Sequence, residues 1–122
     1  MKKEIIFYQK ENWDIPVKMF LDSLKIKDPY LLATILNKLE LLSLNLLWLD
    51  DLKYLGDRIF ELRIKKSSNI SQIFYFTLWG DSIILLDWII KKDDKLKNWA
   101  LKKFTNYRDD YLIRRKKSLT FK

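Results

Sequence analysis

The spacing of the apolar residues changes twice along this chain, and this limits the folds that it can adopt. Between Val17 and Leu42 the apolar side chains recur every three or four residues, which indicates amphipathic helices. Between Ile59 and Ile90 they alternate or form short continuous runs, which indicates strands. From Asp94 the helical spacing returns. The order of these segments predicts an α+β fold.

The first third of the chain predicts one strand and a pair of helices. Ile5 to Tyr8 is β-branched and aromatic and is expected to form a strand. We expect Asn12 or Asp14 to cap the first helix, with Pro16 in its first turn. Asp28-Pro29 begins a second helix in the same way. The short joint between the two helices predicts a helical hairpin.

The remaining segments predict a twisted antiparallel sheet with a helix after it. Three strands are expected, with a hairpin loop and a turn between them: Ile59 to Ile64, loop Lys65 to Asn69, Ile70 to Leu78, turn Gly80-Asp81, and Ile83 to Ile90. With the N-terminal strand the order is β-α-α-β-β-β-α. We expect a single domain over residues 1–122, with a frayed basic tail from about Arg114.

The composition excludes several classes of chemistry. The chain has no cysteine and no histidine, which excludes disulfides, thiol nucleophiles, thiolate metal sites and imidazole acid–base catalysis. Two glycines are too few for a phosphate-cradling loop. We therefore expect neither a metal nor a cofactor. No apolar run is long enough for a signal peptide or a membrane span, so we expect a soluble cytoplasmic protein.

Positive charge is concentrated in the second half of the chain. Residues 1–61 carry 9 basic and 10 acidic side chains, whereas residues 62–122 carry 15 basic and 6 acidic ones. Aromatic residues, among them Trp79 and Trp88, lie within the same basic half. Such a region is typical of proteins that bind a phosphate backbone. Two other interpretations stay open: a basic face exposed to solvent, or a surface that docks an acidic protein.

Several segments, in order, resemble one family of toxins. The run from Leu52 to Ile64 is similar to a "KxLG…(I/L)(Y/F)ELR" strand, and Ile70 to Phe76 is similar to the strand that follows it. Ile83 to Leu86, followed by Lys91-Lys92, is similar to an "IVLL…F(V/I)KK" strand, and Pro16 to Leu24 matches the first helix. By these motifs the chain resembles the RelE/HigB toxin superfamily, in its phage-derived HigB-like branch.

The resemblance implies a function and a set of partners. Members are toxins of type II toxin–antitoxin pairs, and they cut messenger RNA on the ribosome without a metal. The 2′-hydroxyl attacks the neighbouring phosphate and gives a 2′,3′-cyclic phosphate. The implied partners are a cognate antitoxin, a helix-turn-helix HigA-like repressor, and mRNA on the ribosome, with operator DNA bound only through the antitoxin. No membrane partner is implied.

The resemblance also implies which residues act. It assigns Arg63, Lys91 and Lys92 as catalytic residues, because Arg offers phosphate a two-pronged donor and Lys a point charge. We expect Arg63 to be exposed on its strand, on the side opposite to Phe60, Leu62 and Ile64. The alternative is a solvent-facing Arg that only pairs with Glu61 or with an acidic residue across the strands. The residues expected to bind RNA are Lys53, Lys65, Lys66 and Gln72. Lys65 and Lys66 are included because the hairpin loop would present them to the RNA backbone, although both can also be ordinary loop lysines.

Two departures from the family pattern keep an alternative open. The chain has Gln72 where the family usually has Arg, and Gln cannot neutralise the charge of the reacting phosphate. It has Trp88 where the family usually has Gly, which predicts a large ring near the site. The alternative is a catalytically weak or inactive homologue that acts by binding RNA or an antitoxin.

Overall fold

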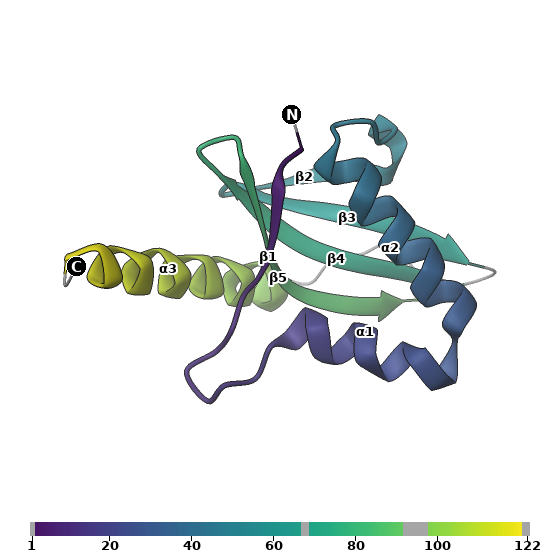
Figure 1. The fold of residues 1–122 in the computed structure, drawn as a ribbon, viewed down its shortest axis with the longest axis horizontal. Coiled ribbons are helices and arrows are strands. Elements are labelled where there is room, and N and C mark those ends of the chain that lie inside the picture. Colours follow the sequence, from purple (N-terminus) through teal and green to yellow (C-terminus); the bar gives the residue numbers. More distant parts are fainter. Residues whose placement is uncertain (1, 67–68, 92–97, 121–122) are drawn as a thin grey trace.

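The computed structural model describes residues 2–66, 69–91 and 98–120, and it shows a mixed sheet with helices on both faces (Figure 1). In chain order the elements are β1 (Glu4–Phe7), α1 (Pro16–Lys27), α2 (Pro29–Ser43), a 3₁₀ turn (Leu49–Asp51), β2 (Leu52–Gly56), β3 (Ile59–Lys66), β4 (Asn69–Leu78), β5 (Ser82–Lys91) and α3 (Asn98–Thr120). This confirms the predicted α+β class and the predicted helices.

The sheet differs from the expected one in two respects. Its strand order is β1-β5-β4-β3-β2, so it contains one more strand, β2, than the sequence indicated. The meander β2 to β5 is antiparallel, but β1 pairs with β5 in parallel, which makes the sheet mixed. Two helices and three strands separate β1 from β5 in the sequence, so the connection is long enough for the parallel pairing.

The helical hairpin is confirmed, but only one of its two expected caps is formed. The Asp28 carboxylate accepts a hydrogen bond from the Leu31 amide at 3.0 Å, which satisfies a free donor at the start of α2. Helix α1 begins at Pro16 without a side-chain cap. Asn12 instead accepts a hydrogen bond from the Asp14 amide within the preceding loop. Proline at the first position needs no cap for its own nitrogen.

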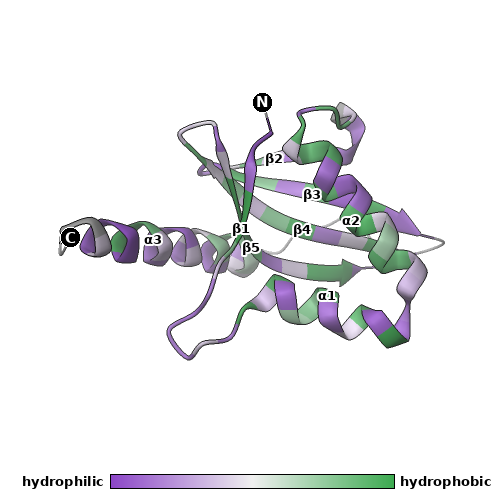
Figure 2. Ribbon diagram, viewed as in Figure 1, coloured by the Kyte–Doolittle hydropathy of each residue, from purple (hydrophilic) through white to green (hydrophobic). Residues whose placement is uncertain are grey.

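Each face of the sheet buries its own apolar cluster. We call the face covered by α1 and α2 the hairpin face; it buries Leu62, Ile73 and Leu85 against α1 and α2. We call the opposite face the α3 face; it buries Phe74 against Phe104 of α3, with ring centroids 4.0 Å apart. Figure 2 shows green segments near the middle of the central strands, and the buried run Ile83 to Leu86 of β5 is the continuous apolar stretch expected of a strand covered on both faces.

The basic segment from Arg114 is part of α3 up to Thr120, so the expected frayed tail is wrong. Arg114 donates to the Asp110 carboxylate at 2.6 Å, and Asp110 also accepts from the Tyr8 hydroxyl at 2.6 Å. Arg114 also donates to the carbonyl of Gln9. These contacts tie the helix to the segment after β1. Among the helices of residues 2–66 and 98–120, none is long and apolar enough to cross a membrane.

Candidate functional site

Strand register brings most of the candidate residues to the α3 face. Gln72 pairs with Arg63 on one side and with Ile89 on the other, and paired residues point to the same face. Ile70 pairs with Lys65 and with Lys91 in the next row. Because Ile59, Phe74 and Ile89 of the same strands belong to the α3-face cluster, these rows lie on that face. We call Arg63, Lys65, Gln72 and Lys91 the β3–β5 end cluster.

Arg63 is largely covered, which corrects the expectation of an exposed side chain. Its side chain is 16% exposed, and its Nε lies 3.2 Å from Oε2 of Glu61, whose side chain is 2% exposed. Arg63 does point away from Phe60, Leu62 and Ile64, as predicted. Removing one partner would leave the other as a buried charge without its partner. The ion pair is therefore part of the fold as well as of the site.

Gln72 is buried beside this ion pair. Its exposed fraction is 0%, and neither atom of its amide has a hydrogen-bond partner among the described residues. Buried amides are usually satisfied, because leaving one unpaired costs about 1 to 3 kcal/mol. Within the part of the chain that the structure describes, Gln72 is therefore an unpaired polar group buried next to a paired Arg.

The lysines of the cluster belong to strands rather than to a loop. Strand β3 continues through Lys66, so the expected loop beginning at Lys65 is wrong. Lys65 lies on the α3 face, whereas Lys66 points to the hairpin face and forms an ion pair with Asp28. Lys66 is therefore separated from the β3–β5 end cluster. Lys92 lies outside the described residues.

Lys53 lies on the same face as the β3–β5 end cluster, whereas Trp88 lies on the opposite face. Lys53 is exposed on β2 and pairs with Glu61, so it lies on the α3 face at the sheet edge. Trp88 is not near Arg63: its ring stacks on Phe20 of α1 with centroids 4.1 Å apart, on the hairpin face. The expected crowding of the site by Trp88 is wrong, because a bulge between β4 and β5 shifts the register just before it.

Sequence reasoning missed a second buried carboxylate, that of Asp87. Its side chain is 9% exposed and accepts from Lys103 of α3 at 2.9 Å and from the Trp88 amide at 2.9 Å. Burial, the largest single effect, lowers the pKa of Lys103, but the hydrogen bond and charge of Asp87 together with the contribution of Tyr107 raise that pKa above its ordinary value. An acidic residue inside an otherwise apolar strand is the signal that could have indicated such a pair.

Residues 19–107 match the family described as phage derived protein Gp49-like (DUF891). The chain belongs to this family. It is a RelE/HigB-like toxin family, which confirms the resemblance given above, and the RelE-type toxins to which it is related are nucleases. No curated protein matches the chain. Toxins of this kind are paired with antitoxins, so membership suggests an antitoxin partner.

The described part of the site offers cations and an amide rather than metal ligands. Within residues 2–66, 69–91 and 98–120, no three His, Cys, Asp or Glu side chains come together as a metal site. Arg63 lies on β3 and Lys91 on β5, with β4 between them, and Lys91 is two residues further along β5 than the position level with Arg63. Their Cα atoms are therefore about 12 Å apart. Long cationic side chains at this spacing can approach one phosphodiester from two sides.

Proposed function

We propose that this protein is the toxin of a type II toxin–antitoxin pair and cleaves messenger RNA on the ribosome without a metal. One observation supports this assignment above all: the register brings Arg63, Gln72, Lys65 and Lys91 to one end of one face of the sheet. Membership of a toxin family related to nucleases supports the same reaction class.

In the proposed reaction the 2′-oxygen of the RNA forms a bond to the adjacent phosphorus, and the bond from phosphorus to the 5′-oxygen breaks. The 2′-hydroxyl loses its proton and the leaving 5′-oxygen gains one. Arg63 and Lys91 stabilise the negative charge that grows on the phosphorane oxygens. Because the chain has no histidine, the protons move through Lys, Glu, Tyr or water.

The ribosome supplies part of the geometry in this mechanism. Because the site has no imidazole base, its rate depends mainly on holding the 2′-oxygen, phosphorus and 5′-oxygen in line. Such alignment can raise the rate by several orders of magnitude. A messenger held in the decoding site meets that requirement before the toxin binds. We therefore expect cuts only in translated messages.

A second candidate function has its own observation. The guanidinium of Arg63 is already neutralised by Glu61, and Gln72 adds no charge. A toxin homologue that binds RNA or an antitoxin without cutting would fit these two facts. The two functions differ in one product, the cut message.

The test is induced expression of the chain followed by primer extension on one message with and without a start codon. We expect growth arrest and cuts in the translated message only, with 5′-hydroxyl ends that polynucleotide kinase labels without prior phosphatase treatment. Lys65→Gln is expected to reduce cutting. Lys66→Gln is the matched control, because Lys66 follows Lys65 in the sequence but points to the opposite face of the sheet. Growth arrest without cuts would favour the second candidate.

A further inference from the structure

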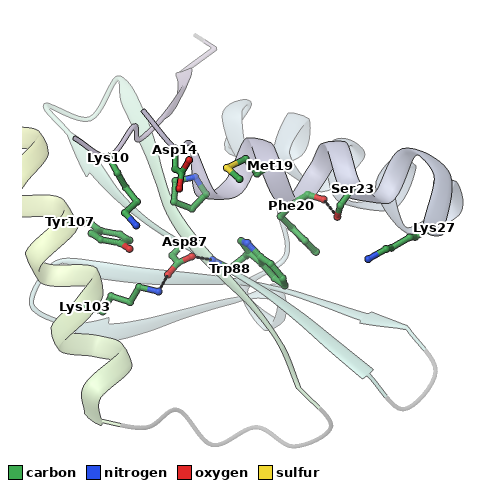
Figure 3. A pocket seen from close by; sticks show the side chains of 11 residues that line it. Lys10, Asp14, Met19, Phe20, Ser23, Lys27, Asp87, Trp88, Lys103 and Tyr107 are labelled. Carbon is green, nitrogen blue, oxygen red and sulfur yellow. Dashed lines mark hydrogen bonds and ion pairs between the residues drawn. The ribbon is translucent and has the colours of Figure 1, made fainter. Parts of the chain in front are cut away.

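A cavity of about 410 Å³ lies along the edge of β5 that does not pair with β4. The β3–β5 end cluster does not line it. It opens between α1, the segment before α1 and α3, and Figure 3 shows its side chains converging from these three directions. Nothing in the proposed cleavage reaction uses this cavity. Its size is within the range of cavities that hold small organic ligands.

One end of the cavity holds two lysines, Lys10 and Lys103, with the carboxylates of Asp14 and Asp87 beside them (Figure 3). The Nζ atoms of Lys10 and Lys103 lie 6.0 and 5.6 Å from the centre of the Tyr107 ring, which stands between them (Figure 3). Lys27 lines the opposite end. The carboxylates of the lining are those of Asp14 and Asp87, so the lining has one positive charge in excess. Because Asp87 is paired with Lys103, an anion would meet the ammonium of Lys10 first.

The middle of the cavity is aromatic. Trp88 lines it with its ring stacked on Phe20 at an interplanar angle of 10°. Trp88 is only partly buried, so part of its ring borders the cavity. Aromatic rings between cationic side chains are the combination that holds the bases and phosphates of single-stranded nucleic acid.

The edge of β5 in this cavity is closed to an added peptide strand. Strand β1 pairs with β5 only as far as Leu85, which leaves the rest of that edge without a described neighbouring strand. At the following bulge, however, the Asp87 carboxylate accepts the hydrogen bond of the Trp88 amide. A carboxylate and a bulge at a sheet edge are features that prevent strand addition. The occupant of the cavity is therefore not an extended peptide.

We infer that this cavity binds a nucleoside phosphate, with the phosphate against Lys10 and Lys103 and the base beside Trp88 and Tyr107. The ligand is either a unit of single-stranded RNA or a free nucleotide, which share this chemistry. If it is RNA, the inference deepens the proposed function by giving the message a second contact on the toxin. The binding itself requires no cleavage.

The five tryptophans of the chain allow a direct test in the purified protein. Labelling the indoles with ¹⁵N gives one signal for each, assigned by Trp→Phe variants. One titration uses adenosine monophosphate, and the other uses an eight-nucleotide RNA with 2′-O-methyl groups, which this reaction cannot cut. We expect the Trp88 signal to move in the RNA titration, and the Trp48 signal, from an exposed ring that does not line the cavity, to stay.

A lysine pair provides the matched control. Lys10→Gln is expected to weaken RNA binding roughly tenfold, as for the loss of one charge-assisted hydrogen bond. It should also reduce the slope of log K against log salt by about 0.7. Lys25→Gln removes an exposed lysine that pairs with Asp22 outside the cavity, and it should leave the affinity unchanged.

Each outcome of the titrations decides the inference. Movement of Trp88 with both ligands, or with RNA alone, identifies a site for an RNA strand, and movement with adenosine monophosphate alone identifies a site for free nucleotides. No movement of Trp88 with either ligand overturns the inference. Movement of Trp79 alone would also overturn it, because that exposed ring lies under Arg115 at the far turn of the sheet. Arg63→Ala should leave the Trp88 response intact, so a failed cleavage test and a failed binding test remain distinguishable.

Discussion

Replacement of Arg63 by Ala tests the buried ion pair of the site. The Glu61 side chain is 2% exposed and that of Arg63 is 16% exposed, with 3.2 Å between Nε and Oε2. Removing one member of a buried pair costs about 3 to 5 kcal/mol, because the remaining charge has no partner. Since Arg63 keeps some contact with water, we expect the lower end, about 3 kcal/mol. In urea this lowers the unfolding midpoint by about 1.5 to 2 M for a chain of this size.

A double-mutant cycle separates this charge effect from the loss of packing. Glu61→Gln with Arg63→Met removes both charges and retains most of the volume, so the double variant should unfold within about 1 kcal/mol of the unchanged protein. The two single changes should therefore be far from additive. Lys18→Ala, which breaks an exposed pair with Asp22, is the control and should cost about 0.5 kcal/mol or less. Additive effects of the two changes in the cycle would refute the reasoning.

Two further predictions concern single polar groups, Gln72 and Asp110. Gln72→Leu removes an amide that has no partner among the described residues, so it should raise the free energy of unfolding by about 1 kcal/mol. The same change should lower cleavage if the amide contacts RNA. A lower melting temperature of the variant would contradict the stability prediction. For Asp110, burial acts to raise the pKa, but the hydrogen bonds from Tyr8 and Arg114 together lower it below its ordinary value of 3.8. A lowered carboxyl pKa gives stability that is complete above that ordinary value and is lost as pH falls through the folded-state pKa. Asp110→Asn should therefore lower the free energy of unfolding at pH 7, and the difference from the unchanged protein should shrink in acid. Urea unfolding of both proteins at pH 7 and pH 3 measures this difference. The same difference at both pH values would argue against the reasoning.

The alternation of the central strands made much of the fold predictable. Side chains 59 to 64 point in turn to the two faces of the sheet, and their directions were predicted correctly. Strand β2 was missed because its Leu-Lys-Tyr-Leu-Gly sequence is short and half exposed, and because its place at the sheet edge depends on pairing with β3. The parallel direction of β1 depends on how the helical hairpin packs, which no local pattern encodes.

For the site, strand period predicted which side chains share a face but not how far they are buried. Arg63 was correctly separated from Leu62 and Ile64 by alternation. The burial of Arg63 depends on Glu61, two residues away on the same face, and on the cover of that face by other elements. Lys66 was assigned to RNA because it was expected in a loop. Two further residue pairs, Lys65 with Ile70 and Lys66 with Asn69, extend the hairpin, and Lys66 points towards Asp28.

The paired state of Arg63 has a consequence for the proposed reaction. A phosphate that binds the guanidinium must either share it with Glu61 or displace that carboxylate, and the Glu61 side chain is 2% exposed. A displaced carboxylate would stay buried beside a second anion, which costs several kcal/mol unless another cation approaches. Lys65 and Lys91 are on the same face and can supply that charge. On the proposed function, RNA free in solution therefore binds this site weakly, and a message already held in position by the ribosome binds it with less loss of entropy.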